Sequence, residues 1–187
     1  MARKSSSRAR PLALEILEAD HRKVETLFKQ YEQEKESDEG SRRPIAERIC
    51  SELTVHAQVE EEIFYPWLRE KLSEEDMELI EEAAVEHSTA KDLIAQLEDG
   101  EVDETYDAKV KVLSEYIKHH VKEEEEEIFP KVADMAEELD EIGQQMAARK
   151  AELADELGLT ETGEDEAMAA ATRVRGGKGS SAQRGAR

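Results

Sequence analysis

The sequence is short of cysteine, of aromatic residues and of long apolar runs. Its single cysteine, Cys50, excludes an internal disulfide framework and is typical of a reducing compartment. No segment approaches the length of a membrane span, and Glu15, Glu18 and Asp20 exclude the apolar region of a signal peptide after the first ten residues. We therefore expect a cytoplasmic protein without a membrane span.

Charged residues make up 39% of the chain, whereas aromatic residues make up only 4%. This balance favours long helices whose outer faces are solvated. A chain of 187 residues can form one domain with a sizeable core, or one domain with tails. The composition of its two ends favours the second arrangement.

Basic residues gather at both ends of the chain. Residues 1–10 carry four basic side chains and residues 171–187 carry five, with no acidic residue in either segment. Without these nine charges the net charge of −21 becomes −30 for residues 11–170. Such an acidic body repels nucleic acid and could attract ferrous ion, although the acidity also serves solubility. The ends are rich in Ser, Gly and Arg, which predicts disordered basic tails that could contact the acidic body, nucleic acid or anionic lipid.

The two halves of the chain repeat one another at an offset of 64 to 66 residues. The apolar residues repeat along with residues of the types that bind metals, and each repeat ends in a proline, Pro66 or Pro130. Such self-similarity predicts two helix pairs that face one site. The matched polar pairs are His21 with His87, His56 with His120, and Glu60 with Glu124.

Helical spacing places these polar residues in the predicted core. His56 and Glu60 are four residues apart, so on a helix they share a face with the apolar Ile49 and Leu53. The second half repeats this arrangement. Burial of unpaired imidazoles and carboxylates costs several kcal/mol, and a pair of metal ions would compensate it. Histidine nitrogen with carboxylate oxygen suits iron or manganese, and less specifically zinc, whereas a zinc finger would need a cysteine pair.

Caps and chain breakers predict five helices over about residues 11–36, 44–72, 73–98, 103–130 and 135–157, with a loop around residues 37–41. Ser73 and Asp103 are expected at helix starts, and Pro66 is expected to distort its helix beyond the turn that carries Glu60. Short connections between long helices predict an all-α fold, an antiparallel up-down-up-down four-helix bundle.

Four motifs together resemble the hemerythrin-like HHE cation-binding family. They are Asp20-His21, His56-Ala-Gln-Val-Glu60, Glu86-His87 and His120-Val-Lys-Glu-Glu124, and with their flanking residues they span residues 12 to about 132. The resemblance implies a four-helix bundle with a non-haem di-iron site that is open to dioxygen or a related small ligand. It also implies the ligand set: His21 and His56 on one iron, His87 and His120 on the other, and Glu60 and Glu124 bridging the two.

The resulting organisation has four parts. A basic tail (residues 1–10) precedes the hemerythrin-like bundle (residues 11–134), which is followed by an additional C-terminal helix (residues 135–157) and a second basic tail (residues 158–187). A ferritin-like site is disfavoured, because ferritin-like proteins use Glu-x-x-His pairs and this chain has His-x-x-x-Glu.

One position departs from the oxygen-carrying members that the chain resembles. These have a fifth histidine four residues after the third-helix histidine, and here Lys91 stands in that place. His119, Glu61, Glu86 and Glu123 are candidates for the missing donor, although His119 is expected to face a neighbouring helix or water. A poorer donor set favours sensing, or peroxide or nitric oxide chemistry, over reversible oxygen storage.

Three functional classes remain open. The first is a small binding or stress-response protein that binds or senses dioxygen, iron or nitric oxide through its di-iron centre. The second is a di-iron enzyme that acts on peroxide, nitric oxide or ferrous ion, and the third is a structural or partner-binding acidic bundle without a redox metal. Because the first class needs no catalytic base, we predict no catalytic residue. Phe64, Tyr65, Trp67 and Phe129 are expected to pack at the end of the bundle.

Overall fold

The computed structural model describes residues 10–34 and 39–159, and within these ranges the chain is helical with no β-strand. The predicted all-α class is therefore confirmed. The two predicted basic tails lie outside the described residues, apart from Arg10 and residues 158–159. Gly158 follows the last helix with a φ of 65°, a conformation that glycine adopts without strain.

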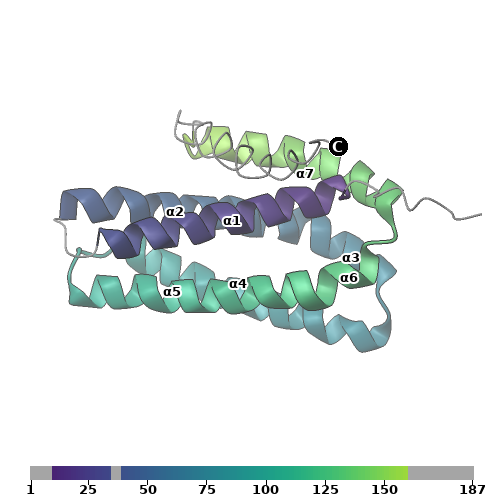
Figure 1. The fold of residues 1–187 in the computed structure, drawn as a ribbon, viewed down its shortest axis with the longest axis horizontal. Helices are drawn as coiled ribbons and strands as arrows, with labels where there is room; N and C mark the ends of the chain where they lie inside the picture. Colours follow the sequence, from purple (N-terminus) through teal and green to yellow (C-terminus); the bar gives the residue numbers. More distant parts are fainter. Residues whose placement is uncertain (1–9, 35–38, 160–187) are drawn as a thin grey trace, which may run out of the picture.

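Five long helices form a bundle (Figure 1). α1 lies beside α2 and α5, and α4 also lies beside α2 and α5, so these four helices form a ring of neighbours. α7 packs on the outside, against α1 and α2. The bounds are α1 (Leu12–Gln33), α2 (Glu39–Val59), α4 (Met77–Glu98), α5 (Glu104–Glu123) and α7 (Ala136–Glu156).

A π-helical turn follows both α2 and α5. The first, η1 (Glu60–Phe64), leads into α3 (Tyr65–Lys71), and the second, η3 (Glu124–Ile128), leads into α6 (Phe129–Val132). Each turn precedes a proline, which has no N–H for the carbonyl four residues earlier. The N–H of the residue before the proline bonds instead to the carbonyl five residues back, which is that of a glutamate in both halves. The helix is thus distorted before Pro66, but the π turn begins at Glu60 itself rather than beyond the turn that carries it, and the same turn recurs before the matched proline.

The start of α2 was wrongly predicted. The helix begins at Glu39 rather than near Pro44, so the expected loop around residues 37–41 is already helical from residue 39. Pro44 deprives the carbonyl of Gly40 of its helical partner, but Gly40 is exposed and water can bond to that carbonyl instead. A helix can therefore run through this proline close to its beginning.

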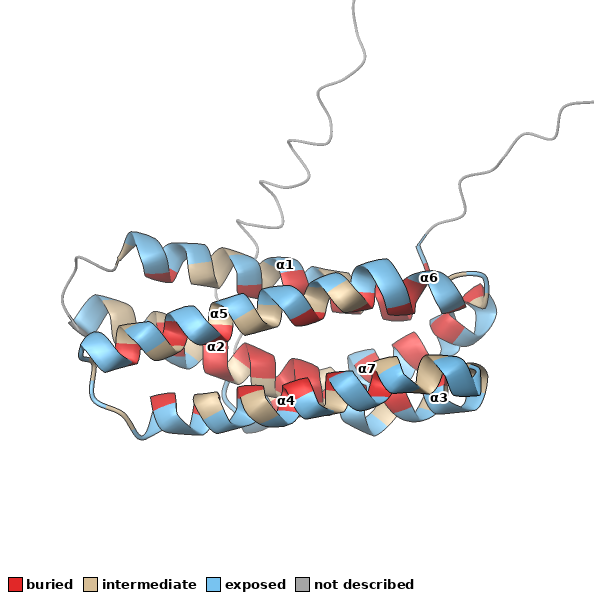
Figure 2. Ribbon diagram, turned by 90° about the horizontal axis from the view of Figure 1, so that it is seen from below, coloured by how far each residue is buried: buried red, intermediate tan, exposed pale blue. Residues whose placement is uncertain are grey.

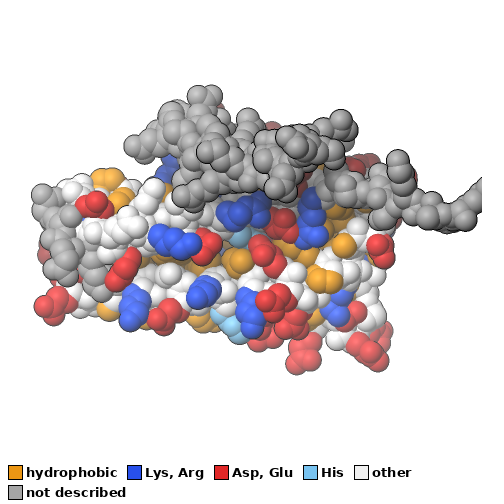
Figure 3. Space-filling view, in the orientation of Figure 1, with side chains coloured by type: hydrophobic (Ala, Val, Ile, Leu, Met, Phe, Trp, Pro, Cys, Tyr) orange, Lys and Arg blue, Asp and Glu red, His pale blue; other side chains and the backbone are white. Residues whose placement is uncertain are grey.

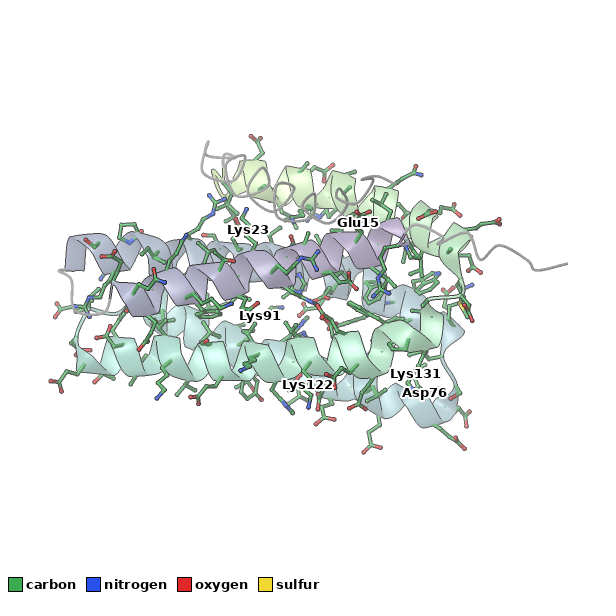
Figure 4. The ribbon with its side chains drawn as sticks, in the orientation of Figure 1. Glu15, Lys23, Asp76, Lys91, Lys122 and Lys131 are labelled. Atoms are coloured by element: carbon green, nitrogen blue, oxygen red, sulfur yellow. The ribbon has the colours of Figure 1, made fainter. Side chains whose placement is uncertain are left out.

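The other two predicted starts are nearly correct. Asp103 caps α5, because its carboxylate accepts the N–H of Tyr106 at 2.8 Å. A short 3-10 turn, η2 (Glu74–Asp76), precedes α4, and the Ser73 hydroxyl bonds to the Asp76 carboxylate at 2.7 Å rather than to a backbone N–H. Asp76 also pairs with Lys131 of α6 at 2.8 Å (Figure 4).

The apolar core has two parts with a polar layer between them. One part, at the end where α3, α6 and α7 meet, includes Leu17, Phe64 and Phe129. The other, toward the opposite end of the bundle, includes Val24, Leu53 and Leu113. Along each helix the buried residues form an inward stripe (Figure 2). The buried histidines and glutamates interrupt these stripes at one level, which positions the candidate site.

The outer surface carries both signs of charge. On the face shown in Figure 3, acidic and basic side chains are interspersed. None of the described helices has the length and apolar character that crossing a bilayer requires. Cys50 is a buried free thiol in the core.

Candidate metal centre

The structure brings all six predicted site residues together in the interior. The candidate ligand atoms of His21, His56, Glu60 and Glu124 all lie within 4.8 Å of one another, and so do those of Glu60, His87 and His120. Every one of the six side chains is buried, with Glu60 and Glu124 completely inaccessible to solvent. Each half of the repeat supplies two histidines and one glutamate, as the sequence predicts.

Each carboxylate contacts one histidine from each half of the site. The rings of His21 and His56 form one pair with centroids 4.9 Å apart, and those of His87 and His120 form a second pair at 4.7 Å. An oxygen of Glu60 lies 3.2 Å from His56 Nε2 and 3.4 Å from His87 Nε2.

Glu124 repeats this arrangement with the other two histidines. Its Oε2 lies 3.2 Å from His21 Nε2 and 3.8 Å from His120 Nε2. Both carboxylates therefore reach across from one histidine pair to the other. This is the placement that bridging carboxylates need, and it fits the ligand set that the family resemblance implies.

A second carboxylate stands behind each histidine. The Nδ1 atoms face Asp20, Glu61, Glu86 and Glu125, while the Nε2 atoms face the centre. A carboxylate can only accept, so a hydrogen bond from Nδ1 to it leaves Nε2 available to a metal, and His21, His87 and His120 make such a bond. The Nδ1 to oxygen distances are 2.8 Å for His21 with Glu125, 3.5 Å for His56 with Asp20, 3.1 Å for His87 with Glu61 and 2.8 Å for His120 with Glu86.

These outer carboxylates are functional residues that the sequence reasoning missed, although a signal for them existed. Asp20 and Glu86 each precede a matched histidine, and Glu61 and Glu125 each follow a matched glutamate. The repeat therefore extends to the residues that orient the ligands. Glu61 and Glu86 had been considered only as replacements for the missing fifth donor.

None of the four candidates for that donor belongs to the inner group. Glu61 and Glu86 contact Nδ1 atoms on the outer side, and His119 is 59% exposed and lies 3.1 Å from Glu123. Lys91, which stands in place of the fifth histidine, bonds to both oxygens of Glu61 at 2.7 and 2.5 Å (Figure 4). Its position thus supports His87 indirectly, through Glu61.

Tyr65 has a polar role in addition to packing. Its ring is buried, and its hydroxyl donates to Glu124 Oε1 at 2.9 Å and lies 3.3 Å from His87 Nε2. The matched residue in the second half is Phe129, which stacks on His21 with a centroid distance of 6.1 Å but has no hydroxyl. The sequence reasoning treated both residues as packing groups, so it missed this difference between the two halves.

Burial and close carboxylates perturb the ionisation of the site. Burial, together with the neighbouring Glu124, raises the pKa of Glu60 well above its usual range. Burial also tends to raise the pKa of Glu124, but its contacts with His120 and His21 outweigh this effect and lower it. Burial lowers the pKa of His56 to about 4 despite its contact with Asp20. Burial therefore favours the protonated form of Glu60, while the neighbouring imidazoles favour the ionised form of Glu124.

Several polar atoms at the centre are left without a hydrogen bond. Within the described part of the chain, His21 Nε2, both oxygens of Glu60, Glu124 Oε2 and both ring nitrogens of His56 have no hydrogen-bond partner although they are buried. Such atoms are costly in an apolar interior unless something coordinates them. Imidazole nitrogen and carboxylate oxygen are donors that iron and manganese accept. The residues present therefore fit a metal pair.

A small cavity adjoins the four histidines. Its volume is about 20 Å³, and it is lined by the histidines together with apolar side chains from all four helices of the ring. These include Val24, Leu53, Ala90, Ile94 and Ile117. One probe sphere of about 10–15 Å³ is enough for a water molecule, so the cavity accepts a molecule of only two or three atoms.

The fold and the site thus define a helical protein with a buried cluster of histidines and carboxylates that is a candidate metal centre. Residues 12–132 match the family model of the hemerythrin HHE cation-binding domain, so the chain belongs to this family. Members of the family bind metal, typically iron. The matched region ends before α7.

The chain is also similar to a protein described as a DNA nickase from Nostoc sp. (strain PCC 7120). The two are 28% identical over 153 residues, which cover 80% of this chain and 42% of the relative. The chain therefore spans about two fifths of the length of that relative. No solved structure matches the chain.

Proposed function

We propose that the protein is a non-haem di-iron protein that binds or senses dioxygen, iron or nitric oxide. The single observation that carries this proposal is the placement of Glu60 and Glu124. Each of them lies against one histidine of each pair, and each has a buried carboxylate oxygen that makes no hydrogen bond. Two iron ions held there would supply open coordination positions and one-electron chemistry. Manganese and zinc are the less favoured occupants.

Three groups of residues would have different roles at such a site. The four histidines would offer Nε2 and the two glutamates would offer bridging oxygens. Glu125, Glu61 and Glu86 orient the rings of three histidines through hydrogen bonds to Nδ1. The surrounding core excludes water, because the inner glutamates have no exposed surface. These features favour binding of a ligand that reaches the metals through the interior.

The cavity supports a diatomic ligand. A volume of about 20 Å³ requires a very small ligand. The apolar part of the lining, which includes Val24, Leu53 and Ile117, suits an uncharged ligand, while Asp20 and Lys91 also line the cavity. Dioxygen and nitric oxide satisfy both conditions. Iron sensing is also compatible, because metal loading itself would compensate the buried polar atoms and stabilise the fold.

We further infer that α1, α2, α4 and α5 form the antiparallel up-down-up-down bundle that the sequence predicts. The ring of neighbours and the short connection between α4 and α5 support this arrangement. A role in a stress response and a cytoplasmic location stay predictions from the sequence.

Metal analysis with absorption spectroscopy tests the proposal. Protein from iron-supplied cells should contain two iron ions per chain, and its spectrum should change when oxygen is admitted after anaerobic reduction. Reversible bands support binding, whereas irreversible oxidation supports sensing or catalysis. A Glu60→Ala variant should lose the iron, whereas Glu126→Ala, which changes an exposed glutamate in the matched turn, should keep it. Normal folding and melting without any bound metal would favour a structural acidic bundle instead.

The enzyme alternative uses the same centre. In that case the iron-loaded protein should turn over peroxide, nitric oxide or ferrous ion many times, and the Glu60→Ala variant should lose turnover together with iron. Binding of one equivalent without turnover would exclude this alternative.

DNA strand nicking is a second candidate function, favoured by the similarity to the Nostoc protein over most of this chain. The acidic body is expected to repel DNA, so the basic residues of segments 1–10 and 171–187 are the candidates to contact it. Conversion of supercoiled plasmid to the open circular form, tested with ferrous ion, Mn²⁺ and Mg²⁺, decides the matter. Nicking that survives Glu60→Ala would separate this activity from the buried site.

A further inference from the structure

We propose that α7 regulates one half of the metal centre through Lys150, which competes with His56 for the carboxylate of Asp20. The proposal rests on metal binding at the site described above. It makes Lys150 a positioning residue, which lies outside the part of the chain that matches the family model.

The chain of contacts runs from the surface helix to the centre in three steps. The Lys150 ammonium donates to one oxygen of Asp20, at the side of α1. The other oxygen of Asp20 lies 3.5 Å from Nδ1 of His56, and Nε2 of His56 lies 3.2 Å from Glu60. Asp20 is buried and Lys150 is half-buried, so this contact is shielded from most of the solvent. A change at α7 can therefore reach a predicted ligand.

The distances indicate that Lys150 prevails in this competition. At 3.5 Å, Nδ1 of His56 makes no hydrogen bond with Asp20 and has no other partner in the described part of the chain. The matched pair in the second half, Glu86 and His120, is 2.8 Å apart. α7 packs on α1 and α2, whereas Glu86 contacts His120 and the exposed His119. Lys91 also shares its carboxylate with a histidine, but Glu61 still bonds to His87 Nδ1 at 3.1 Å. His56 is therefore the histidine whose outer carboxylate, Asp20, is drawn to a lysine and leaves Nδ1 without a hydrogen bond.

A second polar contact joins this part of α7 to the bundle. Arg149 bonds to both oxygens of Glu62, at 2.7 and 3.3 Å. Glu62 lies in η1, two residues after Glu60. The buried Met146 and Leu153, on either side of Lys150 in the sequence, keep α7 packed when either polar contact is removed.

The competition has two linked consequences. A carboxylate behind a ligating histidine orients the ring and increases its basicity, so withdrawal of Asp20 weakens His56 as a ligand. Conversely, a metal on Nε2 makes Nδ1–H a stronger donor and draws Asp20 away from Lys150. Metal loading and the contact between α7 and Asp20 therefore oppose each other, and the coupling must be reciprocal. Binding of a metal would therefore change the contact that Lys150 of the outer helix α7 makes with Asp20.

Anaerobic titration with Mn²⁺ and with ferrous ion tests the first consequence. Lys150→Met should tighten one of the two binding steps by about tenfold, the scale on which outer partners change metal affinity. Lys150→Arg, which retains the competing charge, should resemble the wild type. Arg149→Met is the matched control, because it removes a positive charge and an α7 contact from the same turn without touching Asp20; its affinities should stay unchanged.

The second consequence is tested by acylation of lysine amines followed by mass spectrometry. Metal loading of the wild-type protein should speed the modification of Lys150, because its partner is drawn away. Lys71 is an internal control, since it pairs with Glu138 of α7 and is equally half-buried but has no contact with the site. The labelling of Lys71 should not change on loading.

The outcomes separate this inference from the proposed function. If the wild-type protein binds no metal, the proposed function fails. If it binds two metals but Lys150→Met leaves both steps unchanged or weakens one, the competition is refuted and the metal centre stands. If Arg149→Met increased the metal affinity as much as Lys150→Met, loss of a positive charge near the site would explain both effects. That result would also overturn the inference. Melting curves of the metal-free variants confirm that each is folded.

Discussion

Gly143 marks a close approach of α7 to α1, and Gly143→Ala tests this packing without a change of charge. A Cβ atom at this position would lie 2.6 Å from the amide nitrogen of Ala13 and 2.9 Å from both the carbonyl carbon and the Cβ of Leu12. Two of these three atoms belong to the backbone of α1, which cannot move aside as a flexible side chain can. The added methyl group must therefore displace α7 relative to α1.

Two opposing effects determine the sign of the change in stability. Replacement of glycine by alanine inside a helix contributes about 0.5–1 kcal/mol of stability. Overpacking of a close contact costs about 1–3 kcal/mol. Because the clash is with backbone atoms, we expect the cost to prevail, with a net loss of about 0.5–2 kcal/mol.

This cost is too small to detach α7. Leu139, Met146 and Leu153 are almost completely buried, and burial of such side chains contributes about 1.5–3 kcal/mol each. The helix should therefore stay packed and shift locally. Since Lys150 lies two turns further along α7, the same shift should alter its contact with Asp20.

Thermal unfolding of the metal-free protein, followed by circular dichroism, measures the effect. The midpoint should fall by about 2–4 °C for each kcal/mol lost in a protein of this size. Gln144→Ala changes the adjacent, exposed position of α7 and should leave the midpoint nearly unchanged. A higher midpoint for Gly143→Ala would mean that α7 does not approach α1 this closely.

Three further predictions concern the site and the core. Burial and a neighbouring carboxylate raise the pKa of Glu60. Burial tends to lower the pKa of His21, but contacts with Glu124 and Glu125 outweigh it and raise this pKa to about 10. A metal that binds these two side chains therefore has to displace protons. The affinity for Mn²⁺ should consequently increase from about pH 6 to about pH 8, and calorimetry in buffers of different ionisation enthalpy should detect released protons; a pH-independent affinity would contradict this. Tyr65→Phe leaves Glu124 Oε1 without its donor and should cost the metal-free protein about 1–3 kcal/mol in urea unfolding, whereas an unchanged midpoint would show that the bond contributes nothing. Burial raises the pKa of Cys50 to about 12, so at about pH 8 iodoacetamide should modify it only after unfolding, and rapid labelling of the native protein would place it at the surface.

The repeated sequence made much of the architecture predictable. A helical stripe of apolar residues fixes which face of a helix turns inward, and a histidine at a stripe position must turn inward with it. The duplication adds that both halves turn their polar residues toward one place. His56 with Glu60 and His120 with Glu124 are therefore brought together because each pair lies on the inward stripe of its helix. The same residues lie within the region that matches the family model.

The helix geometry around each proline was less predictable. It depends on whether the carbonyl that loses its N–H partner is solvated or the helix changes type. Pro44 is tolerated within α2, where the carbonyl of Gly40 is exposed. At Pro66 the chain instead forms a π turn. Both are prolines in helical surroundings, and the sequence alone does not distinguish solvation of the free carbonyl from a change of helix type.

Contacts between distant side chains were the least predictable. The bond from Lys150 to Asp20 joins residues 130 positions apart and depends on the rotation of α7 about its axis and on its distance from α1. A charged residue on an amphipathic helix is expected in solvent, so spacing gives no sign of such a contact. Tyr65 was missed for a related reason, since a ring in an apolar cluster predicts packing whether or not its hydroxyl finds an acceptor.

The inner residues and the outer carboxylates follow the twofold repeat, whereas Tyr65, Lys91 and Lys150 do not. On the His87 side, the Tyr65 hydroxyl approaches the imidazole and Lys91 holds the outer carboxylate. On the His56 side, Lys150 withdraws Asp20 from the imidazole. Ring orientation and basicity depend on these outer partners, so two identical metal ions would meet different donors in the two halves. Single side chains outside the repeated residues therefore make the two halves of the site unequal. The metal ion on the His56 side would be bound more weakly than the metal ion on the His87 side.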